Sequence, residues 1–146
     1  MPVTLLDANV LVGLLSEDSE FHNASQRWFM QNARKGWATC PFTQAAFVRI
    51  IANPAASRNV IRPAQAIDVL EDTLRFPVHE FWKDDLSMAE ATPSFRNFLT
   101  GHQQITAAYL LGLSLRHKGR IVTFDRGIAA LASAAGLGDR VTLIAK

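Results

Sequence analysis

Two aspartates follow short strand-like segments near opposite ends of this 146-residue chain. Asp7 follows the apolar segment Val3–Leu6, and Asp125 follows the segment Arg120–Phe124. A continuous apolar run is typical of a buried parallel strand, and ligands of open α/β sheets bind outside the carboxyl ends of the strands. The two carboxylates are therefore predicted to meet at one edge of a parallel sheet.

Clustered carboxylates repel one another, and a hard divalent cation relieves that repulsion. Magnesium takes oxygen ligands, keeps several waters, and can activate one of them against a phosphodiester. The alternative for Asp7 is that it only caps the helix that follows it, because Asp is a preferred N-cap residue. One such Asp is ordinary in an α/β protein, whereas a pair is more specific.

Strands must alternate with helices to bring these aspartates together. The predicted strands are Val3–Leu6, Trp37–Cys40, Phe76–Phe81, Arg120–Phe124 and Val141–Ile144. The predicted helices are Asn9–Leu15, a helix from Ser19 to about Arg34, Gln44–Ala52 (capped by Thr43), Ala64–Leu74, Gln103–Arg116 and Ile128–Ala135. This alternation predicts a three-layer α/β/α fold with a central, mostly parallel sheet of four to five strands.

Composition sets the remaining bounds. The length predicts a single domain over residues 1–146, and 49% apolar with 19% charged residues suffices for a substantial core. A net charge of +2 permits nucleic-acid binding without arguing for it. The single cysteine, Cys40, excludes an intramolecular disulfide framework and fits a reducing cytoplasm. Asp7 interrupts the apolar N-terminus and no basic region precedes it, which argues against a secretory signal peptide. No apolar run is long enough to span a membrane.

Four segments, in this order, resemble a PIN domain, and most of all the VapC toxins of bacterial toxin–antitoxin pairs. They are Asp7-Ala8-Asn9, the stretch from Pro41-Phe42-Thr43-Gln44 to Arg49-Ile50, the helix Gln103–Leu111, and Thr123-Phe124-Asp125-Arg126. The motifs are short, and their order and spacing over nearly the whole chain carry the specificity. The resemblance implies a PIN-like fold, an Mg²⁺- or Mn²⁺-dependent endoribonuclease that cleaves RNA, a VapB-type antitoxin as partner, and a homodimer.

The resemblance also assigns roles at the predicted carboxylate pair. Asp7 would be the first metal ligand, and Asp125 would be the acid after the fourth strand. Asn9 and Thr123 would support this acidic cluster through hydrogen bonds. Each of these residues matches the family pattern at its own position in this sequence.

Two arginines and one glutamine complete the implied site. Arg49 and Arg126 are candidates for contact with RNA phosphate, and the alternative for both is an ordinary intramolecular or surface ion pair. Many PIN domains carry Glu after a Thr at the start of the third helix, whereas this chain reads Thr43-Gln44. Gln44 still offers a neutral carbonyl oxygen to a metal or to its water.

A heavier departure lies in the late helix. The family places a metal-binding Asp in a Thr-Asp-Ala-Tyr-like stretch, and this chain has Ala107 at that position. Because the surrounding residues still match, we interpret Ala107 as an engineered inactivating substitution; natural loss of activity is the alternative. A methyl group cannot bind metal, and cation affinity depends on ligand charge. We therefore expect weak magnesium binding and slow or absent cleavage in an intact fold.

Two other functions compete with the nuclease. A catalytically degenerate PIN domain could bind RNA or a protein partner without cleavage, and Ala107 favours this alternative. Phosphoryl transfer of the haloacid-dehalogenase type has little support, because it needs a second Asp two residues after Asp7, where this chain has Asn9. Apolar residues of the second to fourth helices could form a groove for an antitoxin helix, or could simply be internal core.

Overall fold

The computed structural model of the protein describes residues 2–55 and 60–146. One sheet has the strand order β3-β2-β1-β4-β5, and all of its pairings are parallel. The strands are β1 (Thr4–Leu6), β2 (Trp37–Thr39), β3 (His79–Phe81), β4 (Arg120–Thr123) and β5 (Val141–Leu143). The first strand is therefore the central one, with β2 on one side of it and β4 on the other.

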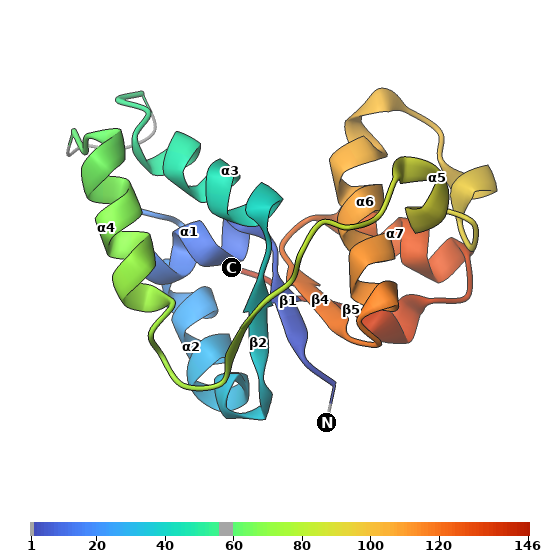
Figure 1. Cartoon of the computed structure of the whole chain (residues 1–146), viewed down its shortest axis with the longest axis horizontal. Coiled ribbons are helices and arrows are strands. Elements are labelled where there is room, and N and C mark those ends of the chain that lie inside the picture. The colour runs from blue at the N-terminus through green and yellow to red at the C-terminus, as the bar shows by residue number, and fades with distance from the viewer. Residues whose placement is uncertain (1, 56–59) are drawn as a thin grey trace.

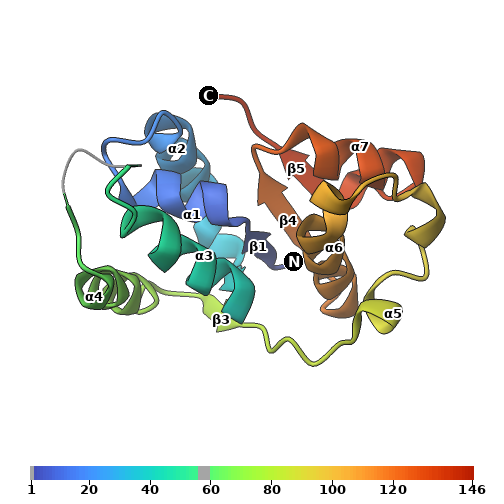
Figure 2. The same cartoon turned by 90° about the horizontal axis from the view of Figure 1, so that it is seen from above.

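Helices cover both faces of this sheet. They are α1 (Ala8–Leu15), α2 (His22–Asn32), α3 (Pro41–Ile51), α4 (Pro63–Thr73), α5 (Met88–Ala91), α6 (Ile105–Arg116) and α7 (Arg126–Ala134), with 3₁₀ turns η1 (Ala33–Lys35), η2 (Arg96–Phe98), η3 (His102–Gln104) and η4 (Gly138–Arg140). Helices α1 to α4 lie on one side and α5 to α7 on the other (Figure 1), and Figure 2 shows the same division from above. Within the described residues, no helix is both long and apolar enough to cross a membrane.

The core lies on both faces of the sheet, and β1 divides it. Leu5 packs in a cluster with residues of α5, α6 and α7, whereas Leu6 packs in a cluster with residues of α1 to α4. Both side chains are fully buried. A strand buried on both faces has no polar face to present, which explains its continuous apolar sequence. The predicted three-layer α/β/α fold with a parallel sheet is confirmed.

Several helices begin elsewhere than predicted, and the local structure explains two of these differences. The third starts at Pro41 rather than at Gln44, with Cys40 as the N-cap residue. Proline suits the first helical position, where a backbone N–H would have no partner inside the helix. The predicted cap, Thr43, lies inside the first turn, where its Oγ1 accepts from the backbone N–H of Cys40 at 3.0 Å. The helix α6 begins at Ile105, two residues later than predicted, because a 3₁₀ turn precedes it.

The third strand is shorter than the predicted segment, which began at Phe76. It begins at His79. Pro77 has no backbone N–H to pair, and Val78 has a φ angle of 66°, which is outside the β region. Both residues exclude a regular strand before His79. The remaining predicted boundaries lie within three residues of those in the structure.

Candidate active site

Asp7 is held by a hydrogen bond to each of its two carboxylate oxygens. It is the N-cap residue of α1, and its Oδ1 accepts from the backbone N–H of Ala8 at 2.8 Å. Its Oδ2 accepts from Oγ1 of Thr123 at 2.6 Å. Capping and a place in the predicted cluster, which were alternatives for this residue, thus coexist in one side chain.

Thr123 joins the two predicted acidic residues. It is the last residue of β4, it is fully buried, and its strand pairs directly with β1. While its hydroxyl donates to Asp7, its Oγ1 accepts from the backbone N–H of Asp125 at 2.9 Å. One hydroxyl therefore fixes the carboxylate of Asp7 and the backbone of Asp125 at the same edge of the sheet.

Asp125 starts α7 as its N-cap residue, and its Oδ1 accepts from the backbone N–H of Gly127 at 2.7 Å. The side chain of Asp125 is exposed. Asn9, in the first turn of α1, lies beside the same loop, and its Oδ1 accepts from the backbone N–H of Phe124 at 3.4 Å. The structure thus brings together the four residues that were predicted to form and support the cluster: Asp7, Asn9, Thr123 and Asp125.

The electrostatics of this pair favour a bound cation. Burial raises the pKa of Asp7 above its ordinary value, the hydrogen bonds from Thr123 and Ala8 oppose this effect, and the charge of Asp125 raises the pKa further. Two carboxylates that disfavour each other's charge are stabilised by a nearby positive ion. The available ligand atoms are oxygens, which are the type of ligand that a hard divalent cation prefers.

The pair alone supplies fewer ligand side chains than such a cation usually binds. Ala107 is the third residue of α6, whose first turn lies at the carboxyl edge because the helix runs antiparallel to β4. Its methyl group is partly buried and packs against the core cluster that contains Leu5 and Cys40. Across residues 2–55 and 60–146, no three His, Cys, Asp or Glu side chains lie close enough to hold a metal ion. Ala107, at the position where the family pattern predicts Asp, offers no ligand atom to the pair.

Gln44 is bonded to a second polar group at the same edge. Its Nε2 donates to Oγ1 of Thr39 at 2.9 Å, and this hydroxyl lies 2.8 Å from Nε2 of His79. All three groups have a partner when Thr39 donates its proton to an unprotonated Nε2. Burial lowers the pKa of His79 below its ordinary value, which agrees with a neutral ring. The carbonyl oxygen of Gln44 is not used in these bonds.

The sequence interpretation missed Thr39 and His79. A usable signal exists for the first, because Thr39 ends a buried strand just as Thr123 does. His79 carries no comparable signal, since its contact with Thr39 depends on the pairing of β2 with β3. These three residues, Gln44, Thr39 and His79, are called the glutamine triad below.

The two candidate arginines border separate hollows. Arg49 lines one of about 420 Å³ with Asp84 and Thr106, the second residue of α6. Arg126 lines another of about 750 Å³ that also contains Asp125 and Phe124. Neither arginine makes an ion pair with any carboxylate among the described residues, which was the predicted alternative. Both guanidinium groups are therefore available to an outside anion.

Known proteins resemble the chain over most of its length. The PIN domain family matches residues 4–134. Ribonuclease VapC39 of Mycobacterium tuberculosis is 39% identical over 130 residues, which cover 89% of this chain and 94% of that protein. Ribonuclease VapC44 of the same organism is 41% identical over 128 residues (88% and 89%), and Ribonuclease VapC38 is 42% identical over 131 residues (89% and 90%). The family match and these relatives, added to the fold and to the geometry of the strand ends, show that the chain belongs to the PIN domain family and to its VapC-type proteins.

Proposed function

We propose that this protein is a VapC-type toxin whose site is built for metal-dependent endonucleolytic cleavage of RNA, and that Ala107 leaves the present chain weak or inactive. The observation that carries the proposal is the bonding of Asp7 and Asp125 to the single hydroxyl of Thr123. The names of the three relatives, all ribonucleases, support RNA as the substrate.

The side chains of this edge divide the work. Asp7, Asp125 and an Asp at residue 107 would hold Mg²⁺ or Mn²⁺. When bound, the ion supplies an activated water and charge stabilisation at the scissile phosphodiester. Thr123 keeps Oδ2 of Asp7 directed to the cluster, and Asn9 holds the loop that leads to Asp125. Arg126 lies next to Asp125 and can neutralise a phosphate there.

The partners follow from the same family. We infer that a VapB-type antitoxin neutralises the protein, that the protein acts as a homodimer, and that it acts in the cytoplasm. The VapC names of the relatives support an antitoxin partner. We also propose that residues 1–146 form one domain. We propose further that Gln44 replaces the Glu of the family pattern as a supporting ligand.

A second function has one specific observation in its favour. Ala107 packs into the core cluster without a carboxylate, so the chain as its sequence stands could bind RNA or a protein partner without cleaving anything. Such a degenerate module would keep the fold and the glutamine triad and would lack turnover. The two proposals predict different effects on RNA cleavage when a carboxylate is restored at residue 107.

A paired cleavage assay tests this difference. The chain, its Ala107→Asp variant and its Ala107→Asn variant are incubated with total RNA and with transfer RNA, in Mg²⁺, in Mn²⁺ and in EDTA. Asn matches Asp in size and lacks its charge, so it separates ligand charge from the mere filling of space. We expect cleavage by Ala107→Asp alone, and its loss in EDTA.

Stability is not expected to obscure the result, because an acidic side chain in the first turn of α6 interacts favourably with the helix dipole. Circular dichroism of the three proteins checks this point. Cleavage that persists in EDTA would contradict metal dependence. Failure of Ala107→Asp to cleave either RNA would contradict the nuclease and favour the binding module.

A further inference from the structure

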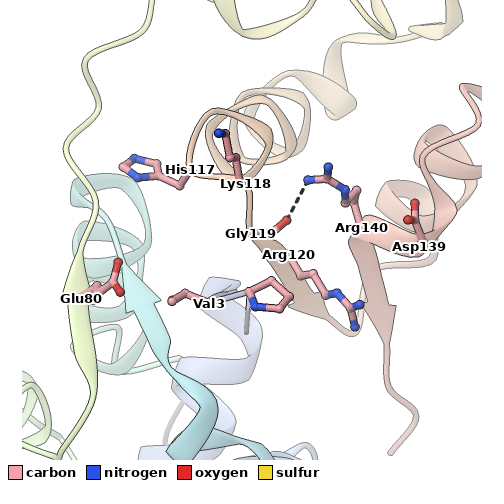
Figure 3. Close-up of a pocket in the computed structure, with 9 residues that line it drawn as sticks. Val3, Glu80, His117, Lys118, Gly119, Arg120, Asp139 and Arg140 are labelled. Atoms are coloured by element: carbon pink, nitrogen blue, oxygen red, sulfur yellow. Dashed lines mark hydrogen bonds between the residues drawn. The ribbon is translucent and has the colours of Figure 1, made fainter.

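The opposite edge of the sheet carries a hollow with a different chemistry. At the amino ends of β1 and β4, a cavity of about 570 Å³ opens between the end of α6, the start of β4 and the turn η4. Three cationic residues line it: Lys118, Arg120 and Arg140. Figure 3 shows Lys118 in the turn after α6, Arg120 at the start of β4 and Arg140 in η4.

The three cations are not paired with carboxylates in the part of the chain that the structure describes. Within residues 2–55 and 60–146, none of Lys118, Arg120 and Arg140 makes an ion pair. Arg140 is partly held, since its Nη1 donates to the carbonyl oxygen of Gly119 at 3.3 Å. The hollow has these three cations against two carboxylates, so its lining keeps an excess of positive charge that an anion would balance.

The backbone fixes the position of Lys118 at the end of α6. The N–H of Gly119 bonds to the carbonyl of Ser114 at 2.8 Å and that of Lys118 to the carbonyl of Leu115 at 3.0 Å, a Schellman motif. Lys118 occupies the left-handed position of this motif, with a φ of 54°, where Gly is usual. The turn thus carries a charged side chain at its most constrained residue.

A flat ring borders the same hollow. His117 is exposed and stacks on Trp82, with ring centroids 4.4 Å apart and an angle of 5° between the planes. Trp82 is almost completely buried, so it is a fixed support for the imidazole. Partial burial lowers the pKa of His117, which favours the neutral form of the ring. A neutral, supported ring of this kind can stack against a nucleobase.

Two carboxylates complete the lining, and they help to identify the ligand. Asp139 and Glu80 border the hollow, and Glu80 accepts from Nε1 of Trp82 at 3.2 Å. The side chains of a purely acidic peptide would offer these two carboxylates no hydrogen-bond donors. A nucleotide offers donors as well as charge, because its ribose hydroxyl and base amino groups can donate to carboxylates.

The geometry points to a second RNA-binding site at the amino edge of the sheet, which takes one nucleotide of a single strand with its base on His117 and its phosphate among Lys118, Arg120 and Arg140. The site rests on the proposed function, since it binds part of the same RNA. Arg120 and Thr123 begin and end β4, so about 10 Å of strand separates this site from the acidic cluster. The site therefore holds a portion of RNA that does not undergo cleavage.

RNA binding by the present chain tests the site without interference from cleavage. Anisotropy of a short, labelled single-stranded RNA is measured in EDTA for the chain and for a Lys118→Asn, Arg120→Gln, Arg140→Gln triple variant. Asn tolerates the left-handed backbone of residue 118. We expect the affinity of the triple variant to fall about tenfold, and the slope of log K against log salt to flatten by about 0.7, because the site neutralises one phosphate of a single strand.

A matched variant controls for net charge. Arg27→Gln, Arg62→Gln and Arg75→Gln remove the same number of cations from exposed positions on and beside α2 and α4. This control is expected to change the affinity by less than about twofold, because the site supplies the local charge. Equal losses in the two triple variants would overturn the site, and circular dichroism verifies that both fold.

His117 separates an RNA site from a general anion site. Ala at this residue should weaken RNA binding about fivefold or more, and Phe should restore it, because base stacking tolerates any aromatic ring. Inorganic polyphosphate, which has no bases, should respond to the cation variant and not to His117→Ala. A poly-glutamate peptide that binds as tightly as RNA, with no effect of His117, would overturn the RNA assignment.

The two proposals can fail separately. Loss of cleavage in the Ala107→Asp protein with RNA binding intact at the amino edge contradicts the nuclease alone. Cleavage by Ala107→Asp, together with RNA binding that the cation variant does not alter, contradicts the second site alone.

Discussion

Thr123 and Thr39 end the two strands that flank β1, and both are fully buried. Each hydroxyl holds a side chain of the carboxyl edge, but the side chains differ in charge. Thr123 donates to the carboxylate of Asp7. Thr39 accepts from the neutral amide of Gln44 and faces the neutral ring of His79. Similar positions in the sheet thus serve an acidic group on one side and groups without acidic character on the other.

This difference indicates which side of the carboxyl edge is more sensitive to substitution. A hydrogen bond to a charged group contributes more than one between neutral groups, and its loss leaves a partly buried charge without a donor. The Thr123 side should therefore respond strongly to substitution, and the Thr39 side weakly. The hydroxyl of Thr39 only orients the amide of Gln44. The hydroxyl of Thr123 both positions the carboxylate of Asp7 and stabilises its negative charge.

The largest effect is expected from Thr123→Val. Valine keeps the shape of threonine and removes the donor to Asp7, so the free energy of unfolding should fall by about 1–3 kcal/mol. In the Ala107→Asp background, cleavage should fall by about 10–100-fold, the usual cost of losing a group that orients a metal ligand. Urea unfolding and initial cleavage rates measure the two quantities.

Thr123→Ser is the matched control, because it keeps the hydroxyl and loses only a methyl group. It should retain most of the cleavage activity. If Ser and Val lower the rate equally, packing rather than hydrogen bonding explains the role of Thr123, and the comparison with Thr39 loses its basis.

Thr39→Val should have a smaller effect. It removes the partner of Gln44 and His79, which are both neutral, so we expect a loss of about 1 kcal/mol in unfolding free energy and less than about tenfold in cleavage by the Ala107→Asp protein. The pKa of His79 should rise, because the neutral ring loses its donor. NMR titration of the histidines follows this change, and an unchanged His79 pKa would contradict the proposed direction of the bond.

The smallest effect lies in the pH dependence of stability, where the two sides have opposite signs. Burial raises the pKa of Asp7 above 3.8, so the folded chain is stabilised as the pH falls through that raised pKa. Burial lowers the pKa of His79, and of His117, below 6.5, so their contribution is present above pH 6.5 and is lost as the pH falls through the lowered values.

Two variants separate these trends in EDTA. Asp7→Asn should remove the gain in stability at acidic pH, and His79→Gln should reduce the loss that begins below pH 6.5. Urea midpoints measured across this range give both slopes. A pH profile that Asp7→Asn leaves unchanged would show that Asp7 does not carry the charge assigned to it.

The sequence predicted the carboxylate pair because two local signals coincide with one topological rule. Asp7 and Asp125 each follow a strand, and parallel strands end at one edge. The glutamine triad escaped prediction because His79 and Thr39 meet only through the pairing of β2 with β3. The predicted start of the third strand at Phe76 was wrong, because Pro77 and Val78 exclude regular strand pairing before His79.

The amino-edge hollow shows the same limit. Lys118 and Arg120 are neighbours in sequence and could be noted as basic, but Arg140 joins them only through the turn that precedes β5. The stacking of His117 on Trp82 also depends on tertiary packing. Local patterns predict what a strand end can hold, and they do not predict which distant side chains complete a surface.

The bond between Thr123 and Asp7 spans 116 positions of the chain. A ribosome makes the polypeptide from its N-terminus, so Asp7 emerges long before the strand that completes its surroundings. A nascent chain that stops before β4 has neither Thr123 nor Asp125, and it lacks the central pairing of β1 with β4. The two aspartates of the acidic cluster therefore come together only after β4 has been made, so local folding of the N-terminal segment cannot form the cluster by itself.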